Sequence, residues 1–295
     1  MSETKPSSER IYLLLSLMVL FWSFNYVVGK LALREFPPLL LVGLRTILAG
    51  VILLPVYLWR EGIGGSVWTW RELRLLVPLG LCGAVANQLF FVLGLARTSV
   101  AHAAIVIATT PILVLLMASA QGQERISTRK LAGMAIAFAG IVVLQLGRSP
   151  TSAATPLGDL FILMGALTFS GFTVLGKSMS ARHGGITVNT IAYVSGALLL
   201  APLVLWQGSG FHFQAISALG WWSVFYMAAF SSVISYLIFY YALTHIPASR
   251  VTVFSYLQPV LATLMAIPIL REPVHPGLLL GGSLALVGVY VTERS

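Results

Sequence analysis

The sequence predicts an all-α polytopic membrane protein, with ten transmembrane helices arranged as two inverted five-helix repeats. Three observations support this prediction. Of the 295 residues, 58% are hydrophobic and only 9% are charged, whereas a soluble domain carries about 25% charged residues. The apolar residues form continuous runs that do not alternate with polar ones, which favours helices over a β-barrel. Finally, one sequence pattern occurs twice along the chain, 148 residues apart.

Each apolar run is close to the roughly 20 residues that a helix needs to cross a bilayer. The first five runs cover residues 11–30, 38–59, 73–95, 100–120 and 129–147. The second five cover residues 157–177, 187–206, 219–242, 249–269 and 275–292. We therefore divide the chain into a first repeat at 11–147, a polar linker at 148–156 and a second repeat at 157–292.

The doubled pattern consists of one proline, one glutamate and two glycines. Its first copy is Pro111, Glu124, Gly133 and Gly140, and its second copy is Pro259, Glu272, Gly281 and Gly288. The glycines predict close helix packing, because small residues at these intervals let two helices approach. Since five spans per half is an odd number, the second copy enters the membrane upside down. Inverted repeats of this kind are typical of transporters.

The distribution of positive charge predicts the orientation of the chain. Placing both termini in the cytoplasm puts most of the 18 Lys and Arg residues on the cytoplasmic side, as the positive-inside rule requires. We expect a multi-pass protein of a bacterial-type inner membrane. The net charge of +9 does not indicate nucleic-acid binding, because the basic residues are scattered between apolar segments. Cys82 is the only cysteine, which excludes an internal disulfide and a cysteine-based metal site.

With these features the sequence resembles the EamA-type members of the drug/metabolite transporter superfamily. The resemblance covers residues 11–292 and rests on Trp22, Ser23 and Asn25 near the first span, on the Lys30/Lys177 pair, and on the doubled pattern. It implies ten helices in two EamA repeats, with a central substrate cavity lined mainly by helices 1, 3, 4, 6, 8 and 9 and with helices 5 and 10 at the periphery. It also implies alternating access and, for many bacterial members, export of amino acids or other small metabolites.

The two glutamates of the doubled pattern have two interpretations. Glu124 and Glu272 each precede the last helix of their repeat, where a carboxylate can accept hydrogen bonds from helix N-terminal amides and clamp a loop. Alternatively they form gates, because Lys30 and Glu272 share the outer side and Lys177 and Glu124 share the inner side. We hypothesise the charge pairs Lys30–Glu272 and Lys177–Glu124, one near each mouth. The competing explanation is that each lysine interacts with the C-terminus of its own helix.

Arg45 is the one basic residue clearly inside a predicted span. It lies on the order of 10 Å from the outer end of that span, at 1.5 Å per residue. Its guanidinium can bind a substrate carboxylate through two parallel hydrogen bonds. The alternatives are that it extends outward to the interface or pairs with Glu35. Two points oppose a substrate role: span 2 is peripheral in the family that the chain resembles, and Ala192 replaces Arg45 in the second repeat.

Polar side chains within the apolar spans are the candidates for lining a cavity, because a bare amide facing lipid is costly. The candidates are Trp22, Asn25, Asn87, Gln88, Thr110, Ser170, Thr173, Ser235, Tyr236, Tyr256 and Gln258. A hydrogen bond between helices explains each amide equally well, and Ser or Thr alone usually bonds a carbonyl of its own helix. Pro111 and Pro259 each free a backbone carbonyl one turn upstream and are candidate hinges.

Several absences in the sequence restrict the mechanism. No Asp or Glu lies in the middle of a predicted span, so the usual carboxylate proton relay of a coupled pump is not evident. The chain has no Walker A motif. The five histidines lie at loops or helix ends without metal-ligand spacing. We therefore expect no cofactor, no metal site and no enzymatic activity.

The sequence predicts an inner-membrane transporter, acting as an exporter of amino acids or related polar or amphiphilic solutes by alternating access. Its expected partners are a small-molecule substrate and the lipid bilayer, and the protein is a monomer or a homodimer. The alternative is efflux of drugs or toxic compounds, which an acid-poor set of polar residues disfavours, because a cationic drug requires a buried carboxylate. Remote alternatives are a membrane-embedded enzyme and a scaffold.

Overall fold

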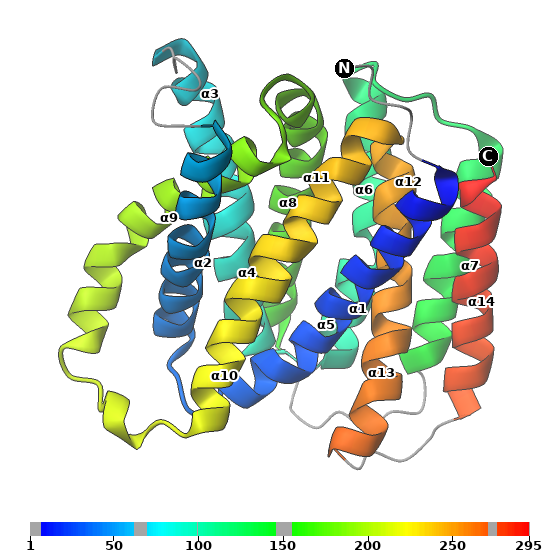
Figure 1. Ribbon diagram of the computed structural model, residues 1–295. Helices are drawn as coiled ribbons and strands as arrows, with labels where there is room; N and C mark the ends of the chain where they lie inside the picture. Colours follow the sequence, from blue (N-terminus) through cyan, green and yellow to red (C-terminus); the bar gives the residue numbers. More distant parts are fainter. Residues whose placement is uncertain (1–6, 62–69, 99, 146–154, 271–275, 295) are drawn as a thin grey trace.

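The computed structural model describes residues 7–61, 70–98, 100–145, 155–270 and 276–294, and all regular structure in these ranges is helical (Figure 1). The helices of the first half are α1 (Ser8–Ala32), α2 (Pro38–Glu61), α3 (Trp70–Gly80), the π-helical segment η1 (Leu81–Ala86), α4 (Asn87–Leu95), α5 (Val100–Ile107), α6 (Thr110–Ala120) and α7 (Thr128–Gln145). Those of the second half are α8 (Pro156–His183), α9 (Gly185–Gly208), the short 3₁₀ helix η2 (Phe213–Ala215), α10 (Ala218–Tyr226), the π-helical segment η3 (Met227–Ile234), α11 (Ser235–His245), α12 (Ala248–Val253), the 3₁₀ turn η4 (Phe254–Tyr256), α13 (Leu257–Leu270) and α14 (Pro276–Glu293).

Among the described residues, seven helical segments are long and apolar enough to cross a membrane. These are α1, α2, the continuous run from α3 to α4, α7, α8, α9 and the continuous run from α10 to α11. Two shorter apolar segments, Ile105–Ala120 and Gly277–Glu293, come next in length. The remaining predicted span corresponds to α12 and α13, which η4 interrupts. The all-helical membrane fold is therefore observed, and the count of ten spans stays a prediction.

The two halves break their helices at corresponding places. The π-helical segments η1 and η3 end immediately before Asn87 and Ser235, two positions that are 148 residues apart. A second break separates α5 from α6 just before Pro111, and η4 forms a matching break just before Pro259. Both proline breaks occur where the sequence predicts them, because a proline cannot donate to the carbonyl one turn upstream. Nothing in the sequence signals the π-helical segments, which are rare and are often found at functional sites.

Helices of one half pack on helices of the other half in a reciprocal pattern. Figure 1 shows α7 beside α14 at one edge of the bundle and α2 beside α9 at the opposite edge. Between these edges, α1 packs on α11 and α13, whereas α8 packs on α4 and α6. The first helix of each half therefore contacts the third and fourth segments of the other half. Because α1 and α8 each pack on the opposite half, both halves contribute to the centre of the bundle.

The pairing of α7 with α14 depends on the glycines of the doubled pattern. A Cβ atom added at Gly140 would lie 2.7 Å from the carbonyl oxygen of Gly281, and one added at Gly281 would lie 2.5 Å from that of Gly140. Real Cβ atoms do not approach backbone atoms so closely, and the two helices therefore touch backbone to backbone. The predicted packing role of these glycines is confirmed.

The two ends of the described chain lie at the same end of the bundle. The hydroxyl of Tyr12, in α1, donates a hydrogen bond to the carboxylate of Glu293, in the last turn of α14. The guanidinium of Arg250, at the start of the second half's broken segment, lies 3.7 Å from the same carboxylate. We call this end the terminal end and the other the far end.

Candidate functional site

A cavity of about 110 Å³ lies between the two halves. Its volume is several times the ~10–15 Å³ that one water molecule needs. The first half contributes Met18, Trp22, Asn25, Tyr26, Arg45, Asn87, Gln88, Phe91, Ile107 and Thr110 to the lining. The second half contributes Ile162, Gly165, Ala166, Phe169, Ser231, Tyr236, Phe239, Val251, Thr252, Ser255 and Gln258. The cavity therefore depends on both halves, as the family resemblance implied.

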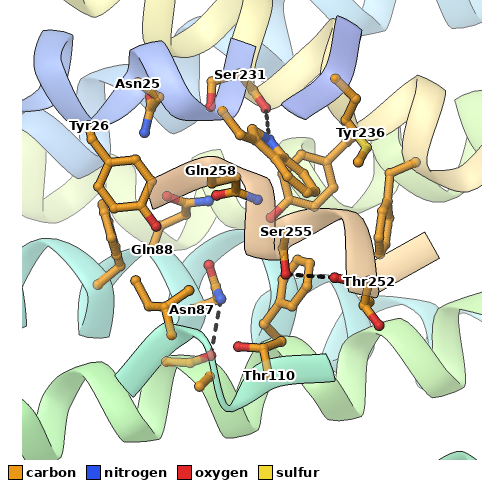
Figure 2. Close-up of a pocket in the computed structure, with 18 of the residues that line it drawn as sticks. Asn25, Tyr26, Asn87, Gln88, Thr110, Ser231, Tyr236, Thr252, Ser255 and Gln258 are labelled. Atoms are coloured by element: carbon orange, nitrogen blue, oxygen red, sulfur yellow. Dashed lines mark hydrogen bonds between the residues drawn. The ribbon is translucent and has the colours of Figure 1, made fainter. Parts of the chain in front are cut away.

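Four polar side chains converge on the cavity from helices that have just passed a break. Figure 2 shows the ends of Asn87, Gln88, Tyr236 and Gln258 pointing toward one space. Asn87 and Gln88 follow η1, Tyr236 lies just after η3, and Gln258 follows η4. The amide nitrogen of Asn87 donates to the carbonyl oxygen of Gly165 at 3.1 Å, which fixes its side chain. The helix breaks therefore direct amide and phenol side chains into the cavity. Polar groups that faced lipid in this part of the protein would be costly.

Aromatic rings form much of the remaining wall. The ring of Trp22 meets that of Tyr236 edge to face, with centroids 5.5 Å apart, and lies 6.0 Å from that of Phe169. Its indole nitrogen donates to the carbonyl oxygen of Ser231 at 3.1 Å, which connects α1 to η3. Tyr26 packs edge to face on Phe91, with centroids 5.5 Å apart. The cavity consequently offers apolar faces as well as a few directed polar groups, as binding pockets for small molecules generally do.

Among the described residues of the lining, Arg45 is the only one with a charged side chain, and it comes from α2. Its exposed fraction is 2%. Its Nε donates to Ser232 Oγ at 2.8 Å and its Nη2 to Ser231 Oγ at 3.2 Å. Among the described residues, no carboxylate pairs with the guanidinium, and Nη1 has no hydrogen-bond partner.

Two expectations about Arg45 are wrong. It does not extend to the interface, since it is almost completely buried. It does not pair with Glu35 either, because the Glu35 carboxylate accepts hydrogen bonds from the backbone N–H and the hydroxyl of Ser217, both at 2.7 Å. Helix α2 lies at an edge of the bundle, as the resemblance implied for span 2, but it still contributes Arg45 to the cavity lining. Helical periodicity in a segment that is apolar almost all round cannot reveal which face points to the protein interior.

Seven of the eleven sequence-predicted cavity residues line the cavity. They are Trp22, Asn25, Asn87, Gln88, Thr110, Tyr236 and Gln258. The other four, Ser170, Thr173, Ser235 and Tyr256, are buried but lie outside the lining. The first three donate their hydroxyl hydrogens to carbonyl oxygens one turn back along the chain, at 2.7, 2.8 and 2.9 Å. A short hydroxyl satisfied in this way needs no cavity, which explains why hydroxyl residues were poorer predictors than amides.

The sequence candidates omitted lining residues of two kinds. The apolar residues, such as Met18 and Phe239, carry no signal that separates a cavity wall from an ordinary core. Ile107 and Ser255 each lie four residues before a proline of the doubled pattern, where a carbonyl is freed, and the reasoning that marks the prolines as hinges also points to these two lining residues. Ser231 lies in η3, and a π-helical segment has no recognised sequence pattern.

Glu124 connects the two halves at the terminal end. Its carboxylate accepts hydrogen bonds from the Ser249 backbone N–H at 3.0 Å, from the Ser249 hydroxyl, and from Lys130 Nζ at 3.0 Å. Its side chain is only 4% exposed. Burial alone would raise the pKa of this carboxyl, but the hydrogen bonds from Ser249 and then Lys130 hold the pKa below its ordinary value.

The hypothesised pair between Lys177 and Glu124 is not formed in this structure. Lys177 Nζ instead donates to the carbonyl oxygen of Ile246 at 3.2 Å, and Lys130 takes the place beside Glu124. Lys130 is six residues from Glu124, just inside α7, and a local partner requires no long-range alignment. In the second hypothesised pair, Glu272 lies outside the described residues. The pair Lys30–Glu272 therefore stays a prediction.

Within the described ranges, no group of three or more His, Cys, Asp or Glu residues could hold a metal ion. The described polar groups of the cavity are amides, hydroxyls, an indole and one guanidinium. This donor set suits the binding and orientation of a polar solute, because amides and hydroxyls donate and accept hydrogen bonds without reacting.

A sequence-family comparison gives this architecture an identity. The family model described as EamA-like transporter family matches residues 9–146 and again residues 156–294. The chain belongs to the EamA-like transporter family. The two matches correspond to two repeats, and the chain is a multi-pass membrane transporter. This membership points to a transporter rather than an enzyme.

Relatives of this EamA-like transporter extend over nearly its whole length. An uncharacterized transporter of Archaeoglobus fulgidus is 30% identical over 97% of this chain and 98% of its own. The uncharacterized transporter YetK of Bacillus subtilis is 26% identical, covering 91% of this chain and 82% of its own. The uncharacterized inner membrane transporter YedA of Escherichia coli K12 is 28% identical, covering 84% and 79%. A solved crystal structure has the same fold, with a TM-score of 0.80 at 22% identity and 98% of each chain covered.

Proposed function

We propose that this EamA-like transporter exports amino acids or related small polar or amphiphilic metabolites across an inner membrane by alternating access. The observation that carries the proposal is the cavity between the two halves, which is lined by amides, hydroxyls, aromatic rings and one guanidinium. Such a lining offers hydrogen bonds to the polar end of a solute and apolar faces to its side chain.

The reciprocal packing of the halves supports alternating access. If the repeats are inverted, each contact of α1 with α11 and α13 has a counterpart in the contacts of α8 with α4 and α6. The same relation makes α2 correspond to α9 and α7 to α14, and these are the pairs at the two edges. A carrier built in this way can exchange the conformations of its halves, which closes one mouth while it opens the other.

The common location of the two ends of the chain supports the proposed orientation. An even number of spans returns the chain to its starting side, and Tyr12 and Glu293 are in contact at the terminal end. Together with the positive-inside rule, this favours ten spans with both termini in the cytoplasm. In this orientation Glu124 lies at the cytoplasmic mouth and Glu35 at the outer mouth.

The charge of the lining favours a zwitterionic solute over a cationic one. None of the lining residues that the structure describes is Asp or Glu, whereas a cationic drug would need a carboxylate or a largely aromatic cage to replace its hydration. The aromatic walls keep efflux of an apolar toxic compound as the second candidate function. The two candidates differ in whether the transported solute carries a polar or charged head group.

Flux measurements in proteoliposomes test the proposed function. Radiolabelled amino acids are offered for uptake and for efflux, with and without a pH gradient, beside empty liposomes. We expect saturable movement of one or a few amino acids that ignores the gradient, because the lining has no carboxyl group to carry a proton. Movement only with the gradient would contradict the uncoupled mechanism. No movement of any amino acid, together with movement of a hydrophobic dye, would replace the proposal by the efflux alternative.

A further inference from the structure

Arg45 carries a positive charge that is almost completely buried. A guanidinium has five N–H donors and remains protonated in proteins. The structure gives two of these donors a protein acceptor, through Nε and Nη2, and leaves Nη1 without a partner. A charge at this depth is costly when nothing neutralises it. The described protein residues therefore supply no anion to neutralise this charge.

The immediate neighbours of Arg45 are hydroxyl groups that can be shared with a ligand. Ser232 Oγ donates to the carbonyl oxygen of Met227 at 3.0 Å and uses a lone pair to accept from Arg45 Nε. Ser231 Oγ accepts from Nη2 at the longer distance of 3.2 Å. Both serines lie in η3, so the helix irregularity positions them opposite α2. Serine hydroxyls are neutral, and they orient the guanidinium without offsetting its charge.

The cavity connects this charge to a second unpaired polar atom. Arg45, Ser231 and Asn25 all belong to the lining, and Figure 2 shows Asn25 and Ser231 on the same side of the cavity. The Oδ1 atom of Asn25 is buried and has no hydrogen-bond partner. Arg45 and Asn25 therefore both line the cavity, and each carries one buried polar atom without a hydrogen-bond partner. An α-amino acid carries the complementary pair, a carboxylate and an ammonium group.

We propose that Arg45 binds the carboxylate of the transported solute, with Ser231 beside it and with Asn25 Oδ1 accepting from the ammonium group. This inference rests on the proposed function and specifies the chemical class that the cavity selects. Guanidinium and carboxylate form two parallel hydrogen bonds, and each partner neutralises the other. Nη1 gains its missing partner, and the hydroxyl of Ser231 can turn to donate to the same carboxylate. Amines without a carboxylate leave the positive charge unpaired and are rejected.

Matched ligand pairs test this site on the wild-type protein. Leucine is compared with leucinamide, and phenylalanine with phenylalaninamide, by thermal shift and by inhibition of flux in proteoliposomes. Each pair differs only at the carboxylate. We expect the amides to bind at least about tenfold more weakly, since a lost charge-assisted hydrogen bond corresponds to roughly that factor or more. Equal binding of acid and amide overturns the inference and leaves the proposed function intact.

Variants then assign the discrimination to Arg45. We expect the Arg45→Gln variant to bind acid and amide equally. We expect the Arg45→Lys variant to keep a reduced preference for the acid, because an ammonium retains the positive charge but not the two parallel N–H donors of a guanidinium. Arg97→Gln is the matched control, since Arg97 is exposed and lies outside the cavity lining. If the Arg45→Gln variant does not fold, the Arg45→Lys variant and the wild-type ligand pairs still show whether Arg45 discriminates between acid and amide. Retention of full discrimination in Arg45→Lys and Arg45→Gln would make Arg45 a structural cross-link.

Two further outcomes have distinct meanings. If the wild-type protein binds and moves neither member of any pair, the proposed amino-acid function fails, and this inference fails with it. The second outcome comes from varying the chloride concentration, with sulfate replacing the chloride. If chloride displaces the amino acids as strongly as another amino acid does, the site holds an inorganic anion, and the assignment to a solute carboxylate is wrong.

Discussion

Ser249 donates both its backbone N–H and its hydroxyl to the carboxylate of Glu124, and this contact joins the two repeats at the terminal end. Ser249 lies at the start of α12, and Glu124 lies in the loop before α7. Lys130 adds a charge partner at 3.0 Å. The relationship makes Glu124 a clamp between halves, which agrees with the loop-clamp interpretation, whereas the gate pair with Lys177 is not formed. If the carrier works by alternating access, as proposed, this contact loosens when the terminal end opens.

Replacing the Glu124 carboxylate weakens the clamp. We expect Glu124→Gln to lower the free energy of unfolding by about 1.5–3 kcal/mol, because hydrogen bonds to a charged group contribute about that much and Lys130 loses its partner of opposite charge. Thermal unfolding in detergent at neutral pH measures the change. Glu61→Gln is the control, since the ion pair between Glu61 and Arg60 is long, at 4.0 Å, and partly exposed. An unchanged melting temperature for Glu124→Gln would contradict the clamp.

The same carboxylate produces a pH dependence of stability. Its pKa is lower in the folded protein than its ordinary value. Its contribution is therefore complete above the ordinary carboxyl range and is lost as pH falls through the lowered pKa. We expect the melting temperatures of the wild type and Glu124→Gln to differ most near neutral pH and to converge in acid. A difference that stays constant down to acid pH would exclude Glu124 as its source.

Glu35 makes the corresponding contact at the far end. Its carboxylate accepts two hydrogen bonds from Ser217, the N-cap residue of α10, and these lower its pKa. We expect Glu35→Gln to favour opening of the far end, whereas Glu124→Gln favours opening of the terminal end. Spin-label distances across each end measure both variants. Shifts of the two variants in the same direction would show that the contacts do not control opposite mouths.

The glycine contact between α7 and α14 predicts a steric effect. A Cβ at Gly140 would meet the backbone nitrogen of Ala285 at 2.6 Å, whereas one at Gly171, inside α8, would meet nothing within 4 Å. We expect Gly140→Ala to destabilise the protein by about 1–3 kcal/mol, the usual cost of overpacking. Gly171→Ala should be neutral or stabilising by up to about 1 kcal/mol. Equal melting temperatures for the two variants would disprove backbone contact at Gly140.

The distinction between lining and non-lining polar residues predicts different transport phenotypes. Gln88 points into the cavity, whereas Ser170 bonds a carbonyl of its own helix. We expect Gln88→Leu to raise the KM by about tenfold or more, the effect of losing one or two hydrogen bonds to a bound solute. Ser170→Ala should change the KM by less than about twofold. Initial rates in proteoliposomes provide the comparison, and a larger effect at Ser170 would contradict the proposed lining.

The general architecture followed from the sequence because its causes are local and periodic. Continuous apolar runs require helices in a membrane, and the doubled pattern identified Pro111 and Pro259 as break points and the glycines as packing positions. Amides were reliable candidates, because an amide has four hydrogen-bonding positions and is rarely satisfied within one helix. Asn25, Asn87, Gln88 and Gln258 all line the cavity.

The missed features depend on rotation and long-range packing, which one sequence does not encode visibly. The rotation of α2 places Arg45 against η3, and although a lone charge in an apolar helix is expected to face the protein interior, the sequence does not show which element it meets there. The identity of the lysine that pairs with Glu124 was also missed. Lys130 and Lys177 are both basic residues at the same end of the bundle. The choice between them depends on a few ångströms of helix placement.

Accessibility of the cavity from both sides tests alternating access most directly. Ile107 lines the cavity and makes no polar contact there, so Ile107→Cys in a Cys82→Ala background provides one reporter thiol. A membrane-impermeant maleimide is applied to right-side-out and to inside-out vesicles, with and without amino acids. Alternating access predicts that the thiol is labelled from each side and that a transported amino acid slows the labelling. Labelling from only one side under every condition, or from neither side, would contradict it.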